Sequence, residues 1–224
     1  VPLSFSMAVD LIPRQHRGLA GGLITGVAYM AANLIPESWS MVDFSRPLQI
    51  FMPLSVLALA GLAFIPNPYI TSLAGQNQEQ AFREGRYARQ RDRRLLVLII
   101  LMFGVFFTDS LGFLRLLDTP QFMEGAWQST SFQVRLLIAI VHLMAALIGG
   151  VLYRYLDVRE LFYWIYGIFT LTHLLYSLHI RLNSNVVPLT MTILYAVAVS
   201  LYTVVNFALW ADLSTPDNIG LNTA

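Results

Sequence analysis

The sequence of 224 residues contains no cysteine and no lysine, and it has few charged residues of any kind. The absence of cysteine excludes disulfide bonds, thiolate nucleophiles and thiolate metal sites from this sequence. Charged residues make up only 12% of it, about half the share in soluble domains, whereas hydrophobic residues make up 56%. The net charge of +1 does not indicate nucleic-acid binding. Because so little polar surface cannot cover a globule in water, we expect the chain to lie in a lipid bilayer.

Six runs of mainly apolar residues are each long enough for a transmembrane helix, which needs about 20 residues. The runs are 18–36, 47–66, 95–117, 134–153, 161–179 and 189–211. A further helical segment, 1–12, is only about 18 Å long at 1.5 Å per residue and is too short to cross. We therefore predict an all-α integral membrane protein, and we expect this sequence to be an interior piece of a longer one.

The distribution of arginine predicts the orientation of these helices. Ten of the 14 arginines lie in the loops 13–17, 67–94 and 154–160, which alternate along the chain with arginine-poor loops. Because cytoplasmic loops carry an excess of basic residues, we expect these loops and 213–219 to face the cytoplasm. The loops expected on the outer side are 37–46, 118–133 and 180–188. The predicted location is the plasma (inner) membrane.

Two segments of the sequence repeat at an offset of 202 residues. The identities pair Phe5, Asp10, Leu11, Gly18 and Leu19 with Phe207, Asp212, Leu213, Gly220 and Leu221. Each copy carries an Asp at the predicted cytoplasmic end of one helix and a Gly at the start of the next. A repeat of the same orientation is what two parallel halves of six helices would produce.

With this repeat, the chain resembles the major facilitator superfamily of secondary transporters. The resemblance rests on Asp10, Pro13, Arg17-Gly18 and Gly21-Gly22, and on the segment from Gly149 to Arg159, which keeps the Gly, Leu and basic residues of a family motif. It implies a helical bundle of two pseudo-repeat halves, truncated at both ends. In that bundle 1–66 is the end of helix four with helices five and six, 67–94 is a cytoplasmic linker, and 95–224 is helices seven to ten with the start of eleven.

The resemblance implies secondary active transport of a small solute by alternating access, with a proton as a candidate coupling ion and the bilayer as the other partner. It implies no cofactor, no metal site and no catalytic residue. A pump with its own nucleotide hydrolysis is disfavoured because the sequence has no phosphate-binding G-x-x-x-x-G-K-[ST] loop. Two alternatives remain at this point: an integral membrane enzyme, and a membrane receptor or scaffold that transports nothing.

Polar side chains inside predicted membrane helices are candidates for the transport pathway, because they are costly in a bilayer. Asp109 and His142 lie on consecutive helices at similar distances, about 9 and 12 Å, from the outer face, where they could share a proton. The alternatives are that Asp109 caps a helix break at 109–112 and that His142 only bonds a neighbouring helix. Three further residues, Tyr195, Tyr202 and Asn206, follow one face of a helix that the resemblance assigns to the substrate pathway.

Two more groups of residues are predicted to control how the helices move. Gly18, Gly22 and Gly26 recur at four-residue steps and form a ridge for close helix packing. The predicted cytoplasmic gate consists of Asp10, Arg17, Arg154, Arg159 and Asp212. Within it we expect Asp212 to pair with Arg154, or otherwise with Arg159, because a carboxylate at a helix C-terminus needs a basic partner. The alternative is that Asp212 reaches solvent and caps the following turn.

Overall fold

The computed structural model describes residues 12–34, 49, 52–54, 56–57, 60, 93–117, 129–182 and 186–213. All regular secondary structure in these ranges is helical, as the apolar runs predict. The helices are α2 (Arg14–Leu34), α5 (Arg93–Leu117), α7 (Phe132–Tyr155), α8 (Val158–Leu182) and α9 (Val186–Leu213). They coincide with five of the six predicted spans, and the sixth, 47–66, lies largely outside the described residues.

Three of the described helices are long and apolar enough to cross a membrane. These segments are Phe132–Tyr155, Val158–Leu178 and Pro188–Asp212. α5 contains a shorter apolar stretch, Ile99–Gly112. A helical membrane protein is therefore supported, whereas the two-half arrangement of the bundle stays a prediction.

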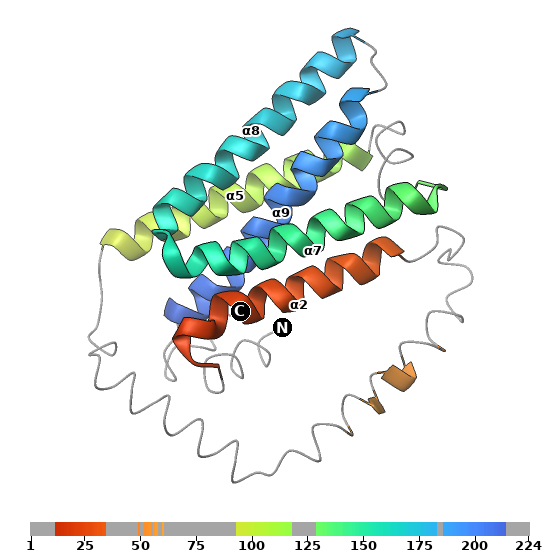
Figure 1. Ribbon diagram of the computed structural model, residues 1–224. Helices are drawn as coiled ribbons and strands as arrows, with labels where there is room; N and C mark the ends of the chain where they lie inside the picture. The colour runs from red at the N-terminus through yellow and green to blue at the C-terminus, as the bar shows by residue number, and fades with distance from the viewer. Residues whose placement is uncertain are drawn as a thin grey trace.

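α9 occupies the centre of the described bundle (Figure 1). It packs against α2, α7 and α8, while α2 and α7 also lie side by side and α5 contacts α8 and α9. Of the three candidate spans, α9 is the most buried. Its apolar core residues pack with α8, where Phe162, Ile165 and Phe169 face Met191 and Tyr195.

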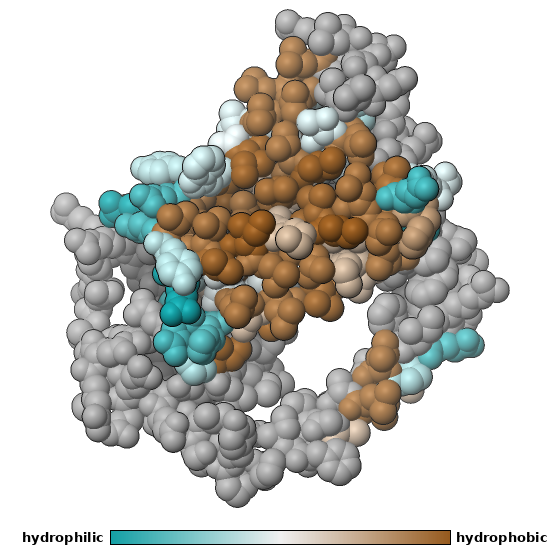
Figure 2. Space-filling view, in the orientation of Figure 1, coloured by the Kyte–Doolittle hydropathy of each residue, from teal (hydrophilic) through white to brown (hydrophobic). Residues whose placement is uncertain are grey.

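The outer faces of the other helices carry large apolar side chains that no described element covers. Examples are Leu23 and Ile24 of α2, Phe103 of α5, Met144 of α7 and Trp164 of α8, all exposed. On the face shown in Figure 2, hydrophobic residues cover most of the described part and hydrophilic ones lie toward its ends. An apolar surface of this extent is unusual for a protein in water and is what a lipid-facing bundle needs.

Consecutive helices run in opposite directions, as the alternation of arginine-rich and arginine-poor loops predicts. The first turn of α2 meets the last turns of α7 and α9, and α8 follows α7 after two residues. Tyr166 of α8 donates a hydrogen bond to the Leu101 carbonyl of α5 at 2.8 Å, and His173 lies beside Gly112, so α5 and α8 run in the same direction. We call the end that carries Arg17, Tyr153 and Asp212 the inner end, and the opposite one the outer end.

Candidate functional site: a buried ion pair at one end of the bundle and a polar interior

The glycine ridge of α2 packs directly against α7, as predicted. A Cβ atom added to Gly22 would lie 2.5 Å from the Ala146 carbonyl oxygen, and one added to Gly18 would lie 2.6 Å from the Gly150 carbonyl oxygen. At Gly26 the added atom would lie 2.9 Å from Leu143. Because a Cβ at Gly18 or Gly22 would collide with backbone, the two backbones approach closely there. We call the contact between residues 18–33 of α2 and residues 135–150 of α7 the α2–α7 seam.

Replacing a glycine of this seam by alanine should lower the free energy of unfolding. Gly22→Ala should destabilise the folded protein by about 1–3 kcal/mol, because the new methyl group collides with backbone and cannot be accommodated by a side-chain rotation. Gly167→Ala in α8 is the matched control, since an added Cβ there meets nothing within 4 Å. Thermal unfolding of the full-length protein in detergent should show a lower midpoint for Gly22→Ala alone. Equal midpoints for the two variants would contradict the close packing.

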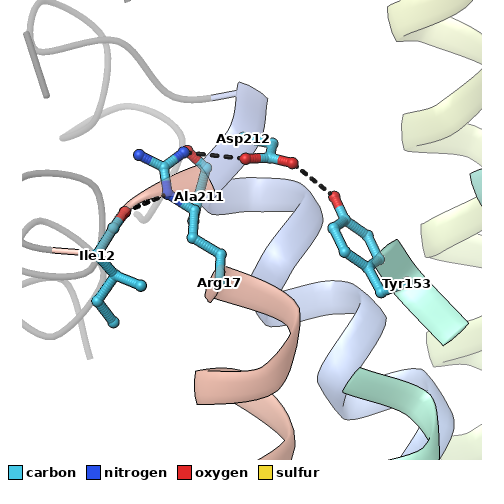
Figure 3. A network of polar contacts seen from close by, with 5 residues as sticks. All are labelled: Ile12, Arg17, Tyr153, Ala211 and Asp212. Atoms are coloured by element: carbon cyan, nitrogen blue, oxygen red, sulfur yellow. Dashed lines mark hydrogen bonds and ion pairs between the residues drawn. The ribbon is translucent and has the colours of Figure 1, made fainter. Parts of the chain in front are cut away.

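A buried ion pair joins the first turn of α2 to the last turn of α9 (Figure 3). Arg17 Nη1 lies 3.0 Å from Asp212 Oδ1, and the two side chains are 7% and 9% exposed. The same nitrogen donates to the Ala211 carbonyl at 2.9 Å, and Arg17 Nε donates to the Ile12 carbonyl at 3.1 Å. On the other side, the Tyr153 hydroxyl of α7 donates to Asp212 Oδ2 at 3.0 Å. Three helices are therefore tied together at the inner end.

The position of Arg17 explains why this network forms. Gly18, the next residue, lets α2 approach α7, so the Arg17 side chain reaches the end of α9 that carries Ala211 and Asp212. The last carbonyls of a helix carry partial negative charge, so a guanidinium is favoured there even before the carboxylate is counted. Removing one partner from a buried pair leaves the other charge without compensation, at a cost of about 3–5 kcal/mol.

The predicted pairing of Asp212 with Arg154 is wrong, and so is the alternative with Arg159. Both carboxylate oxygens of Asp212 are engaged by Arg17 and Tyr153. Arg154 is exposed, with its guanidinium 5.6 Å from the centre of the Tyr155 ring. The exposed Arg159 donates its backbone N–H to Asp157 at 3.3 Å. Of the predicted gate residues, two meet in the structure, and Asp10 lies outside the described residues.

Asp109 of α5 and Tyr195 of α9 form another polar contact between helices. The Tyr195 hydroxyl lies 2.7 Å from Asp109 Oδ1 and donates to it. Tyr195 can approach because Gly112, one turn further along α5, has no side chain: an added Cβ would lie 3.1 Å from the Tyr195 ring. The alternative of a helix break at 109–112 is wrong, since α5 is continuous from Arg93 to Leu117.

His142 is buried in the seam and does not contact Asp109. Its Nδ1 lies 2.8 Å from Ser200 Oγ of α9, and its ring stacks on Tyr29 of α2 at 4.7 Å between centroids. The expected sharing of a proton between Asp109 and His142 is therefore not supported. Their partners on α9 explain this, because Tyr195 and Ser200 lie about 140° apart around that helix. A hydrogen bond to a neighbouring helix, the alternative for His142, is what the structure contains.

The three residues predicted on one face of α9 lie in different surroundings. Tyr195 and Tyr202 are buried in the apolar core with α8, where Tyr195 meets Phe169 edge to face at 5.8 Å. Asn206 is half-buried. The role of this face as a substrate surface stays a prediction.

Several residues of the interior escaped the sequence analysis. Tyr153 belongs to the segment Gly149 to Arg159, but nothing in its sequence context indicates that it reaches Asp212. Arg135 lies one residue inside a predicted span, where a basic residue usually marks a helix end; it is in fact 9% exposed. Tyr29 lies in an apolar run, and only its contacts with His142 and Thr203 on other helices reveal its role, whereas Asn33 donates to the Tyr29 carbonyl within α2.

Within the described ranges, no three His, Cys, Asp or Glu residues are arranged to hold a metal ion. Neither a scan against protein-family models nor searches of curated proteins and of solved structures found a match for this chain. Function is therefore inferred from the contacts themselves: a buried ion pair at one end, a close-packed glycine seam, and polar side chains inside an apolar bundle.

Proposed function

We propose that the chain is part of a secondary transporter of the major facilitator type, which moves a small solute across the plasma (inner) membrane by alternating access. The observation that carries this proposal is the buried pair of Arg17 and Asp212. If α2 belongs to the first half and α9 to the second, this pair closes the inner end between the halves. Its partners come from the two copies of the 202-residue repeat.

The α2–α7 seam is a second observation that supports the proposal. Small residues let two helix backbones approach closely, and alternating access moves one bundle of helices against the other as a rigid body. The ion pair at the inner end of this seam would then be broken and remade in each transport cycle. Such a contact gives a transporter two discrete arrangements rather than a continuous deformation.

The proposal also includes the coupling of transport to a proton that binds Asp109. A carboxylate in an apolar helix is costly unless it serves a function, and a proton is the simplest ion that it can bind and release. Tyr195 gives the carboxylate a partner that the charged form prefers, since a hydroxyl donates more strongly to a charged oxygen. Proton binding would weaken this contact between α5 and α9 and so connect ion binding to helix movement.

Alternating access can be tested before the solute is known. The sequence lacks cysteine, so single reporters can be introduced in the full-length protein after any cysteines elsewhere in it are replaced. Ala208→Cys, one turn before Asp212 on α9, and Ala139→Cys, toward the outer end of α7, replace fully buried residues. In proteoliposomes, a bulky impermeant maleimide attached at Ala208→Cys should suppress labelling of Ala139→Cys. A maleimide attached at Ala139→Cys should likewise suppress labelling of Ala208→Cys.

This reciprocity separates the proposal from its alternatives. A membrane enzyme, or a receptor without transport, has no need to expose the two reporters in turn. If modification of one reporter leaves the labelling rate of the other unchanged, alternating access is contradicted.

A further inference from the structure

Three buried side-chain atoms of the described residues have no hydrogen-bond partner: Asn33 Oδ1, Arg135 Nε and His142 Nε2. All three belong to helices of the α2–α7 seam. His142 contacts α2 through Tyr29, and Arg135 lies two turns before it on the same face of α7. Buried polar groups are usually paired, so three exceptions on one pair of helices need an explanation.

The packing register brings Asn33 level with Arg135. α2 and α7 are antiparallel, and Gly22 lies opposite Ala146. Eleven residues after Gly22 is Asn33, and eleven residues before Ala146 is Arg135. The two residues therefore occupy the same level at the outer end of the seam, and His142 lies about 10 Å further in along α7.

The surroundings of Arg135 contrast with those of Arg17, the other buried arginine of the described residues. Arg17 has a carboxylate and two backbone carbonyls as partners. Among the described residues, no carboxylate lies within ion-pair distance of Arg135, although its side chain is only 9% exposed. A guanidinium stays charged at all accessible pH values, so Arg135 cannot avoid the cost of burial by losing its proton.

We propose that Arg135 binds the carboxylate of a small organic solute at the outer end of the α2–α7 seam. The inference rests on the proposed transport function and names its substrate class. A carboxylate supplies the two oxygens that a planar guanidinium pairs with side by side. Asn33 Oδ1 accepts a hydrogen bond from a hydroxyl or ammonium group of the same solute. A carboxylate is favoured over a phosphate, because a single buried arginine balances one negative charge and not two.

The first test measures the local electric field without any solute. Asn33→Cys places a thiol at the level of Arg135 on the facing helix, and its reaction rates with an anionic (sulfonatoethyl) and a cationic (trimethylammonioethyl) methanethiosulfonate are compared. The ratio of the two rates should exceed the ratio at the exposed control Thr130→Cys by about tenfold or more. Adding Arg135→Gln should abolish this preference, and Arg135→Lys should keep it. An unchanged ratio in Asn33→Cys/Arg135→Gln, or no reaction with either reagent, would overturn the proposal.

The second test measures binding to the full-length protein with native Asn33. Acetate, glycolate, succinate and glutamate are compared with phosphate and with neutral glycolamide by thermal unfolding, since a ligand of the folded state raises the midpoint. At least one carboxylate should raise it by several degrees, and Arg135→Gln should remove the shift, whereas Arg154→Ala should keep it. No shift with any of the four, an equal shift with glycolamide, or a shift with phosphate alone would overturn the proposal.

The outcomes distinguish this inference from the transport function. If carboxylates bind at Arg135 but the two reporters do not label reciprocally, only the transport function is contradicted, and the protein is a receptor that binds an anion. If the reporters label reciprocally but Asn33→Cys shows no preference for the anionic reagent, only the inference about Arg135 is contradicted, and the protein is a transporter whose solute is not held by Arg135.

Discussion

Asp212→Asn is expected to open the inner end of the full-length protein and to raise the labelling rate of Ala208→Cys by about a hundredfold or more. The substitution keeps the shape of the side chain but removes its charge, so Arg17 stays buried without a counter-ion. This costs the closed state about 3–5 kcal/mol, and each 1.4 kcal/mol changes a population ratio tenfold. The measurement is the initial rate of reaction with an impermeant thiol reagent applied from the cytoplasmic side.

The matched control for this prediction is Arg154→Ala. Arg154 is the partner that its position in the sequence suggested for Asp212, but it is exposed and lies over Tyr155. Exposed charges contribute under about 1 kcal/mol, so this variant should label at nearly the wild-type rate. Equal increases in both variants would mean that the inner end is closed by general surface charge and not by the buried pair.

Asp109→Asn is expected to abolish the pH dependence of inner-end accessibility. In the proposed mechanism, protonation of Asp109 weakens its contact with Tyr195, so wild-type labelling of Ala208→Cys should change between high and low pH. Because the thiolate is the reactive form of the reporter, each rate is divided by the reaction rate of free cysteine at the same pH. Asparagine imitates the protonated acid, so the normalised rate of the variant should equal the low-pH value of the wild type at every pH. A hydrogen bond to a charged group contributes about 1.5–3 kcal/mol, which corresponds to a change of about tenfold or more.

Asp157→Asn is the control for the pH experiment. Asp157 is an exposed carboxylate before the first turn of α8, where it accepts a hydrogen bond from the Arg159 backbone N–H at 3.3 Å. Asparagine caps a helix about as well as aspartate, so this variant should keep the contact and leave the pH response in place. A normal pH response in Asp109→Asn would show that Asp109 is not the coupling site.

The helices could be predicted from the sequence because the bilayer imposes a length and an apolar composition on each of them. Residues 134–153 and 189–211 fall inside α7 and α9, whose ends extend by only a few residues. The glycine ridge was equally predictable, because steps of four place Gly18, Gly22 and Gly26 on one face of a helix. These are local properties, which one segment carries without its partners.

The partners of the polar residues could not be predicted in the same way. Arg17 and Asp212 are 195 positions apart, and their contact depends on how α2 and α9 pack. Depth arithmetic put Asp109 and His142 at similar levels, but depth does not say which faces meet. Their partners lie on different sides of α9, a fact that only the packing supplies.

The most direct test of the central claim, that Arg17 and Asp212 close the inner end between two moving halves, is an exchange of their charges. Arg17→Asp and Asp212→Arg should each raise the labelling rate of Ala208→Cys strongly, since each puts two like charges in a buried contact. The double variant restores an opposite pair, so its labelling rate should fall back at least tenfold toward that of the wild type. A double variant that labels as fast as the faster single variant would contradict the claim.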